Sequence, residues 1–189
     1  MKRRLQEGTM KFTAPLLFVI TITFAAGAAR AEEGSESSGR QDPNAYGFGL
    51  ALTIGEGMYF IHDEVYRGPV SLEIVPSFGW SWFKFDLGLS TTLESIQIAG
   101  THVGNWNFTF RPGGRLTPPM LPLYLRVAFP LQIQRHNFDW GVMFGLGADI
   151  HLVGILGLVL EADTTLNNDL SWGSDGVPLE FRAGLSLHF

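Results

Sequence analysis

The chain has 189 residues, 46% of them hydrophobic, with 18 acidic and 13 basic side chains and no cysteine. The lack of cysteine excludes disulfide bonds, thiolate metal sites, catalytic thiols and a lipid-modified cysteine anchor. The acidic balance disfavours a nucleic-acid partner, because phosphate binding requires clustered Lys and Arg.

The N-terminus has the three parts of a secretory signal peptide. A cationic segment, "MKRRLQEGTMKF", precedes an apolar run at residues 14–29, and small residues follow at Ala29 and Ala31. The run has 16 residues, fewer than the roughly 20 that a spanning helix needs. We therefore predict a signal peptide over residues 1–31. Its removal leaves 8 basic and 17 acidic residues, and a net charge near −9.

The segment that follows, residues 32–45, is polar and rich in small side chains, and we predict a flexible periplasmic tail. From Tyr46 onward, apolar residues recur at every second position. All eight even-numbered residues from 138 to 152 are apolar, whereas Met143 is the only apolar odd-numbered one between them. Such a period of two predicts strands. Eight are expected, near residues 46–54, 70–79, 83–92, 104–112, 120–133, 138–151, 154–163 and 179–189.

The connections between these strands are predicted to be long at one end and mostly short at the other. Long loops are expected at 55–69, 93–103 and 164–178, and "RPGGR" at residues 111–115 is predicted to be a periplasmic turn. The strand at 154–163 changes parity around Leu156, which suggests a β-bulge. Three prolines lie inside predicted strands, where each removes a donor from the ladder: Pro76, Pro122 and Pro130.

The distribution of side chains between the two faces indicates which face meets lipid. One face is rich in Leu, Phe and Trp, and the other carries small residues with isolated charges. Small residues and single charges suit a crowded interior, whereas the exterior of a soluble barrel would be dense in charged residues. A closed barrel also satisfies all its backbone groups internally, as lipid requires. We therefore predict an all-β fold, an eight-stranded antiparallel up-and-down transmembrane β-barrel over residues 46–189.

Aromatic side chains are expected at both membrane interfaces of such a barrel. With both termini on the periplasmic side, the predicted strands place aromatic residues at their ends. The predicted girdle consists of Tyr46, Trp80, Trp82, Trp106, Phe138 and Trp140.

A signal peptide, eight alternating strands, no cysteine and a C-terminal Phe closing the strand "LEFRAGLSLHF" together resemble the small bacterial outer-membrane barrels of the OmpA/OmpX-like superfamily. The resemblance covers residues 46–189 and implies a Gram-negative outer-membrane location. It also implies that Phe189 is part of the signal that the barrel-assembly machinery recognises.

Charged residues on the inward-facing side are predicted to form two sets. The lumen network contains equal numbers of acids and bases: Glu73, Lys84, Asp86, Arg111, Arg126, Asp149, Glu161 and Arg182. Three further acids at strand ends are expected to form a water-accessible outer mouth: Asp139, Asp163 and Glu180. An eight-stranded barrel is barely wide enough for its own side chains. We therefore expect a plugged lumen.

The favoured function is a non-enzymatic, monomeric barrel in outer-membrane lipid, with a structural or surface-interaction role. Two alternatives stay open. One is a channel for small solutes or apolar compounds, as in the OmpW-type barrels, which needs an apolar lumen. The other is a lipid-A-modifying enzyme, for which Asp149, His151 and His188 share the inner face. We expect no cofactor and no metal site: the acidic segments near His62 and Asn167 are predicted to be solvated loops, and the second lacks a calcium-loop spacing.

Overall fold

The computed structural model describes residues 46–61, 64–80, 82–98, 101–104, 107–118, 121–133, 138–168 and 177–189. The predicted signal peptide, the predicted tail, Trp106, and the loop residues 62–63 and 169–176 lie outside the described residues. No helix within the described ranges is long and apolar enough to cross a membrane.

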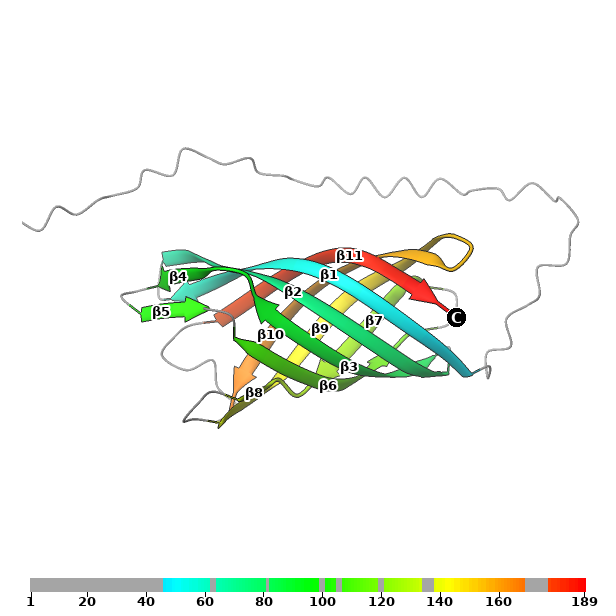
Figure 1. Cartoon of the computed structure of the whole chain (residues 1–189), viewed down its shortest axis with the longest axis horizontal. Coiled ribbons are helices and arrows are strands. Elements are labelled where there is room, and N and C mark those ends of the chain that lie inside the picture. Colours follow the sequence, from blue (N-terminus) through cyan, green and yellow to red (C-terminus); the bar gives the residue numbers. More distant parts are fainter. Residues whose placement is uncertain are drawn as a thin grey trace, which may run out of the picture. The chain divides into compact units, whose positions relative to one another are not determined.

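Eight wall positions form the barrel, and one of them is split into two short strands (Figure 1). The strands are β1 (Tyr46–Ile61), β2 (Glu64–Trp80), β3 (Phe83–Thr92), β6 (Phe108–Leu116), β7 (Leu123–Ala128), β8 (Leu131–Ile133), β9 (Phe138–Val153), β10 (Leu156–Asn167) and β11 (Val177–His188). A separate antiparallel hairpin joins β4 (Ser95–Ile98) to β5 (Thr101–Gly104).

The wall closes on itself through antiparallel neighbours. The order β10-β11-β1-β2-β3-β6-β7-β9 is completed by the pairing of β9 with β10, while β8 pairs with both β6 and β9. At the seam between the chain ends, the Phe48 and Phe189 backbones exchange hydrogen bonds of 3.3 and 2.9 Å. We call the end of the barrel that holds Tyr46 and Phe189 the terminal end, and the opposite end the loop end. The closed antiparallel wall confirms the predicted fold.

The described residues also show which face of the wall points outward. Along β7, Leu123, Leu125 and Val127 are exposed, whereas Tyr124 and Arg126 between them are buried. The other strands repeat this pattern, with 41–56% exposure at outward leucines such as those of β3 and β9. An apolar exterior over a charged interior is the reverse of a soluble core, and it is the arrangement that lipid requires.

Several predicted boundaries were wrong because antiparallel pairing continues past the apolar stretches. The expected loop at 55–69 is instead the outer part of β1 and β2, which pair as far as Ile61 and Glu64. The pairing is interrupted opposite Gly57, where β2 carries one extra residue, because Gly68 and Pro69 both lie between the partners of Glu56 and Met58. The expected loop at 93–103 contains the β4–β5 hairpin. A register shift between Leu156 and Gly157 lies at the position of the predicted bulge, but the extra residue, Leu152, is on β9 and not on β10.

Two prolines explain the largest departures. The "RPGGR" segment was wrongly predicted to be a turn and lies inside β6, where the Pro112 carbonyl still accepts a bond from the Phe129 N–H (2.8 Å). The predicted strand at 120–133 is divided at Phe129 and Pro130, because proline has no N–H for the ladder. The Pro130 carbonyl instead accepts from the Gly141 N–H at 3.0 Å.

Candidate functional site: the charged lumen

Arg126, on β7, lies at the centre of the lumen and is 2% exposed. Its guanidinium donates to Glu73 on β2 at 2.9 Å and to Glu161 on β10 at 3.0 Å. Its Nε lies 3.3 Å from Oδ2 of Asp86 on β3. One side chain therefore joins three other strands across the interior, through charge-assisted contacts that are stronger than neutral hydrogen bonds.

Towards the loop end, two more arginines continue the network. Arg182 on β11 contacts Glu73 and Glu180, and its guanidinium lies 3.2 Å from Asp163 on β10. Arg111 on β6 lies 3.3 Å from Glu180 and 3.5 Å from Glu73. Glu73 thus contacts three arginines, which explains how a carboxylate that is 1% exposed remains satisfied inside the barrel.

Towards the terminal end, Arg115 on β6 also contacts acids on other strands. It donates to Asp86 at 3.1 Å and lies 3.8 Å from Asp149 on β9. Its guanidinium carbon lies 4.3 Å from the centre of the Tyr124 ring, within the range of a cation–π contact. The Tyr124 hydroxyl donates to Glu161 at 2.6 Å and so links this end to the central layer.

The wall makes room for these long side chains by carrying glycine at closely packed positions. A Cβ at Gly88 on β3 would overlap Glu73 Oε1 and lie 2.8 Å from an Arg126 nitrogen. A Cβ at Gly147 on β9 would overlap the Tyr124 ring and lie 2.7 Å from the Leu160 carbonyl oxygen. These two glycines are therefore part of the network, although they carry no charge.

A serine, a histidine and an aspartate meet near the terminal end. Ser186 Oγ donates to Asp149 Oδ1 at 2.8 Å, and His188 Nε2 lies 3.0 Å from Ser186 Oγ and 3.2 Å from the same Asp149 oxygen. In a catalytic triad, the acid and the nucleophile contact different nitrogens of the imidazole ring. Here both contact Nε2, so the three groups form a closed triangle. The His151 ring centre lies 6.2 Å from that of His188.

The structure brings six of the eight predicted lumen residues into contact with one another, and Asp149 joins them only through Arg115, which was not predicted. Lys84, the eighth, is half-buried and forms no ion pair within 4.0 Å with any described residue. The residues joined by ion pairs are Glu73, Asp86, Arg111, Arg126, Asp149, Glu161 and Arg182.

The expected outer mouth needs correction at two of its three acids. Asp163 is 3% exposed and pairs with Arg182, and Glu180 pairs with Arg182 and Arg111, so both belong to the buried network. They are buried because β10 and β11 continue to the loop end beyond these residues. Asp139 remains exposed at the start of β9, where its own carboxylate accepts from the Trp140 N–H.

Arg115 and Tyr124 were missing from the predicted network. Arg115 was placed in a turn, yet it shares the parity of Thr109, Arg111 and Gly113 on β6. Continuing the alternation of that strand past Pro112 would have placed Arg115 inside. Tyr124 has the parity of Arg126 and so faces the lumen, where its hydroxyl is a partner for an acid although it carries no charge.

Four of the predicted girdle residues are exposed at the two ends of the wall. Trp80 and Trp82 are exposed at the terminal end, where the backbone of Tyr46 pairs with that of Trp80. Phe138 and Trp140 are exposed at the loop end of β9. The Phe189 ring is also exposed, with its centre 5.9 Å from that of Phe48.

The sequence matches no protein-family model, and no curated protein matches it. Solved structures do resemble it. A de novo designed transmembrane β-barrel is 14% identical, covers 79% of this chain and 98% of its own, and has a TM-score of 0.51. The fold is that of a small transmembrane β-barrel.

Two further solved barrels are similar at lower scores. Neisserial surface protein A is 10% identical, with coverage of 75% of this chain and 97% of its own and a TM-score of 0.47. A second de novo design, TMB2.3, is 14% identical, with coverage of 74% and 94% and a TM-score of 0.40.

Replacement of Arg126 by methionine should destabilise the barrel by about 3–5 kcal/mol, because three carboxylates lose a shared counter-charge. Lys84→Met is the matched control, since Lys84 also faces the lumen but makes no ion pair; its cost should stay below about 1 kcal/mol. Urea unfolding of barrels refolded in detergent, followed by tryptophan fluorescence, measures both. Equal losses would contradict a central role for Arg126.

Gly147→Ala should cost about 1–3 kcal/mol through overpacking against Tyr124. Gly145→Ala provides the control on the same strand and face, because a Cβ at Gly145 would meet its nearest atoms at 3.5 Å. The temperature at which the compact band disappears from SDS gels should fall for Gly147→Ala alone. A similar fall in both variants would show that β9 tolerates no side chain facing the lumen, whatever its distance from Tyr124.

Proposed function

We propose that this chain is a non-enzymatic outer-membrane protein of the Gram-negative envelope, with a plugged lumen and a structural or surface-interaction role. The observation that carries the proposal is the position of Arg126, which joins Glu73, Glu161 and Asp86 across the barrel. Side chains that meet across the interior support a lumen that is closed to water.

The plug also argues against transport of apolar compounds. An apolar solute would have to displace ion pairs among buried groups, and an unpaired buried charge costs several kcal/mol. The layers around Arg111, Arg126 and Arg115 lie one after another along the barrel, so such a solute would meet this cost at each level.

The loop end supports a surface role. There, Arg67 on the extended β2 contacts Glu56, and its guanidinium lies 2.7 Å from Glu94. The Val70 N–H donates to Glu94 at 2.9 Å, and this bond, together with Arg67, lowers the pKa of the Glu94 carboxyl. The carboxylate is therefore ionised at neutral pH. The structured, charged rim fits a polar partner outside the membrane.

The triangle of Asp149, Ser186 and His188 supports a non-enzymatic role over the lipid-A-modifying alternative. The Ser186 hydroxyl gives its hydrogen to Asp149, and Asp149 contacts the Nε2 atom of His188. Among the described residues, no acid contacts the other ring nitrogen, Nδ1, as the acid of a catalytic triad would. The triangle also lies inside the wall, whereas a lipid substrate would approach from outside.

The proposed partners are outer-membrane lipids and, during biogenesis, the barrel-assembly machinery, with the barrel acting as a monomer. The exposed belt of Leu, Phe and Val side chains supports lipid as the surrounding medium. Phe189 supports recognition during assembly, because its ring is exposed while its backbone holds the closing seam. The terminal end then faces the periplasm.

Planar-bilayer recordings should show no large, steady conductance for the intact barrel. A double variant, Arg126→Ser with Glu161→Ser, shortens the plug while keeping its net charge, and it should conduct more than the intact barrel. Gel mobility before and after heating checks that both proteins are folded. Steady openings of the intact barrel would support the channel alternative instead, and cation selectivity would then point to Asp139.

Deletion of Phe189 should lower the amount of folded barrel in cell membranes but leave the barrel refolded in detergent intact. Phe189→Ala tests the ring alone, because alanine keeps the two backbone bonds to Phe48. If the ring serves assembly, both variants should be depleted in membranes. Wild-type membrane levels of Phe189→Ala would show that the ring only packs against Phe48.

A further inference from the structure

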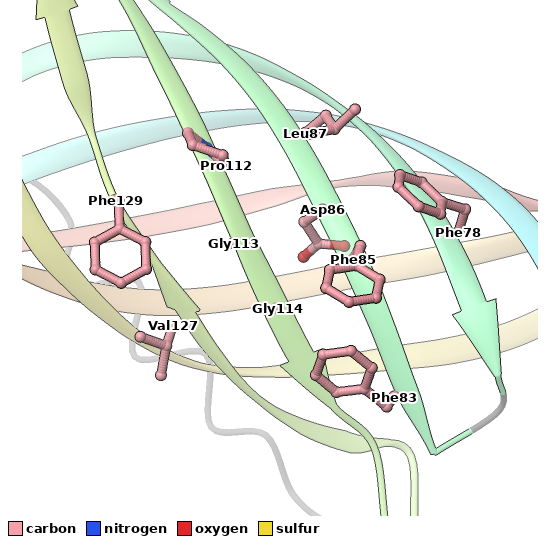
Figure 2. Close-up of a pocket in the computed structure, with 10 residues that line it drawn as sticks. All are labelled: Phe78, Phe83, Phe85, Asp86, Leu87, Pro112, Gly113, Gly114, Val127 and Phe129. Carbon is pink, nitrogen blue, oxygen red and sulfur yellow. The ribbon is translucent and has the colours of Figure 1, made fainter.

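A hollow lies on the outer surface of the wall, where β3, β6 and β7 run side by side (Figure 2). The hollow has a volume of about 410 Å³, within the roughly 300–1,000 Å³ typical of small-molecule sites. We call it the β6 groove. Its lining comprises Phe78, Phe83, Phe85, Asp86, Leu87, Pro112, Gly113, Gly114, Val127 and Phe129.

The groove exists because β6 carries no outward side chain at Gly114, next to strands that carry rings. Gly114 pairs with Phe85 on β3 and with Val127 on β7, and both of these neighbours point outward. The floor is therefore backbone, and the sides are aromatic and aliphatic side chains, as Figure 2 shows.

The aromatic side of the groove is held in place by contacts between its own rings. Phe83 and Phe85 meet edge to face with centres 4.8 Å apart, and Phe78 stacks on Phe85 at 5.7 Å. Such pairs prefer these geometries. The shape of the groove is thus set before anything enters it.

We propose that the β6 groove binds one acyl chain of a phospholipid from the membrane leaflet at the terminal end. Its lining faces the lipid belt, and it lies close to Trp80 and Trp82, which mark the terminal interface. Asp86, the charged residue of the lining, is fully buried and paired with Arg115 and Arg126, so it presents no charge to an occupant.

The chemistry of the groove favours a flexible hydrocarbon chain over a protein partner. Association inside a bilayer gains little from the hydrophobic effect and depends on close packing. A second barrel would present a broad convex wall, which touches the rim and leaves the backbone floor at Gly113 and Gly114 uncovered. An acyl chain is narrow enough to contact the floor and both sides.

Photocrosslinking in proteoliposomes tests the proposal, which rests on the membrane location in the proposed function. The probe is phosphatidylethanolamine with a diazirine on one acyl chain, added in trace amounts to vesicles of phosphatidylethanolamine and phosphatidylglycerol. Adducts per residue, mapped by mass spectrometry, should be enriched at Phe85 and Val127 over Phe181 and Leu185, which face lipid on β11. An acyl chain on the open wall should make about six fewer carbon–carbon contacts than one in the groove, at about 0.1–0.2 kcal/mol each. This difference predicts an enrichment of roughly threefold to sevenfold in the groove.

A filling variant provides the control. Gly114→Leu places a side chain in the groove beside Phe83, whose ring lies 3.1 Å from the position of the new Cβ. It should lower the enrichment to the level of the rest of the belt, whereas Ala183→Leu, on the lipid face of β11, should leave it unchanged. Phe129→Ala removes one side of the groove without adding atoms, and it should also reduce the enrichment. This variant keeps the test available if Gly114→Leu does not fold.

Uniform labelling around the wall would overturn the proposal, and so would enrichment that persists in both groove variants. Crosslinks between two barrels at Val127 would assign the groove to a second copy and overturn it as well. The outcome is separable from that of the proposed function, because a barrel that conducts steadily can still show the enrichment. Vesicle flotation separately reports whether the barrel is in the membrane.

Discussion

The charges inside this barrel must neutralise one another, because the apolar exterior and the narrow lumen leave them little contact with water. Glu73 shows the consequence, with arginines reaching it from β6, β7 and β11. The long side chains fit only because other positions are small. Along β1 the inward residues Gly49, Ala51 and Thr53 are small, and they leave space in the lumen for the long side chains. Charge pairing and small wall residues are therefore one design, and a change to either disturbs both.

The fold could be predicted because successive side chains of a strand point to opposite faces, so apolar and polar residues alternate when the two faces meet different surroundings. Leu125 and Arg126 are neighbours in sequence and lie on opposite sides of the wall, which no other regular structure would require. Strand ends were less predictable, because the strict alternation stops in the outer parts of β1 and β2, where residues 58–61 are all apolar. The backbones of Phe60 and Val65 still pair there, and the pattern of side chains does not reveal backbone pairing.

The membership of the charged site could be predicted, but its partners could not. Parity alone placed Glu73, Asp86, Glu161 and Arg182 inside. Which acid meets which base depends on stagger between strands, and stagger is a property of the closed barrel. Asp163 illustrates this dependence, because its position near a strand end suggested water, while the stagger of β10 against β11 places it beside Arg182.

The middle of β6 is where the two surfaces of the wall depend on each other. Gly114 carries no side chain on the outer face, so Asp86 lies beneath the groove with only backbone between its carboxylate and the lipid. A lone carboxylate so near hydrocarbon would be costly. Arg115 and Arg126 remove that cost from the inside. The arginines that close the lumen thereby also allow the wall to be thin at this point, which gives the outer surface a hollow of defined shape.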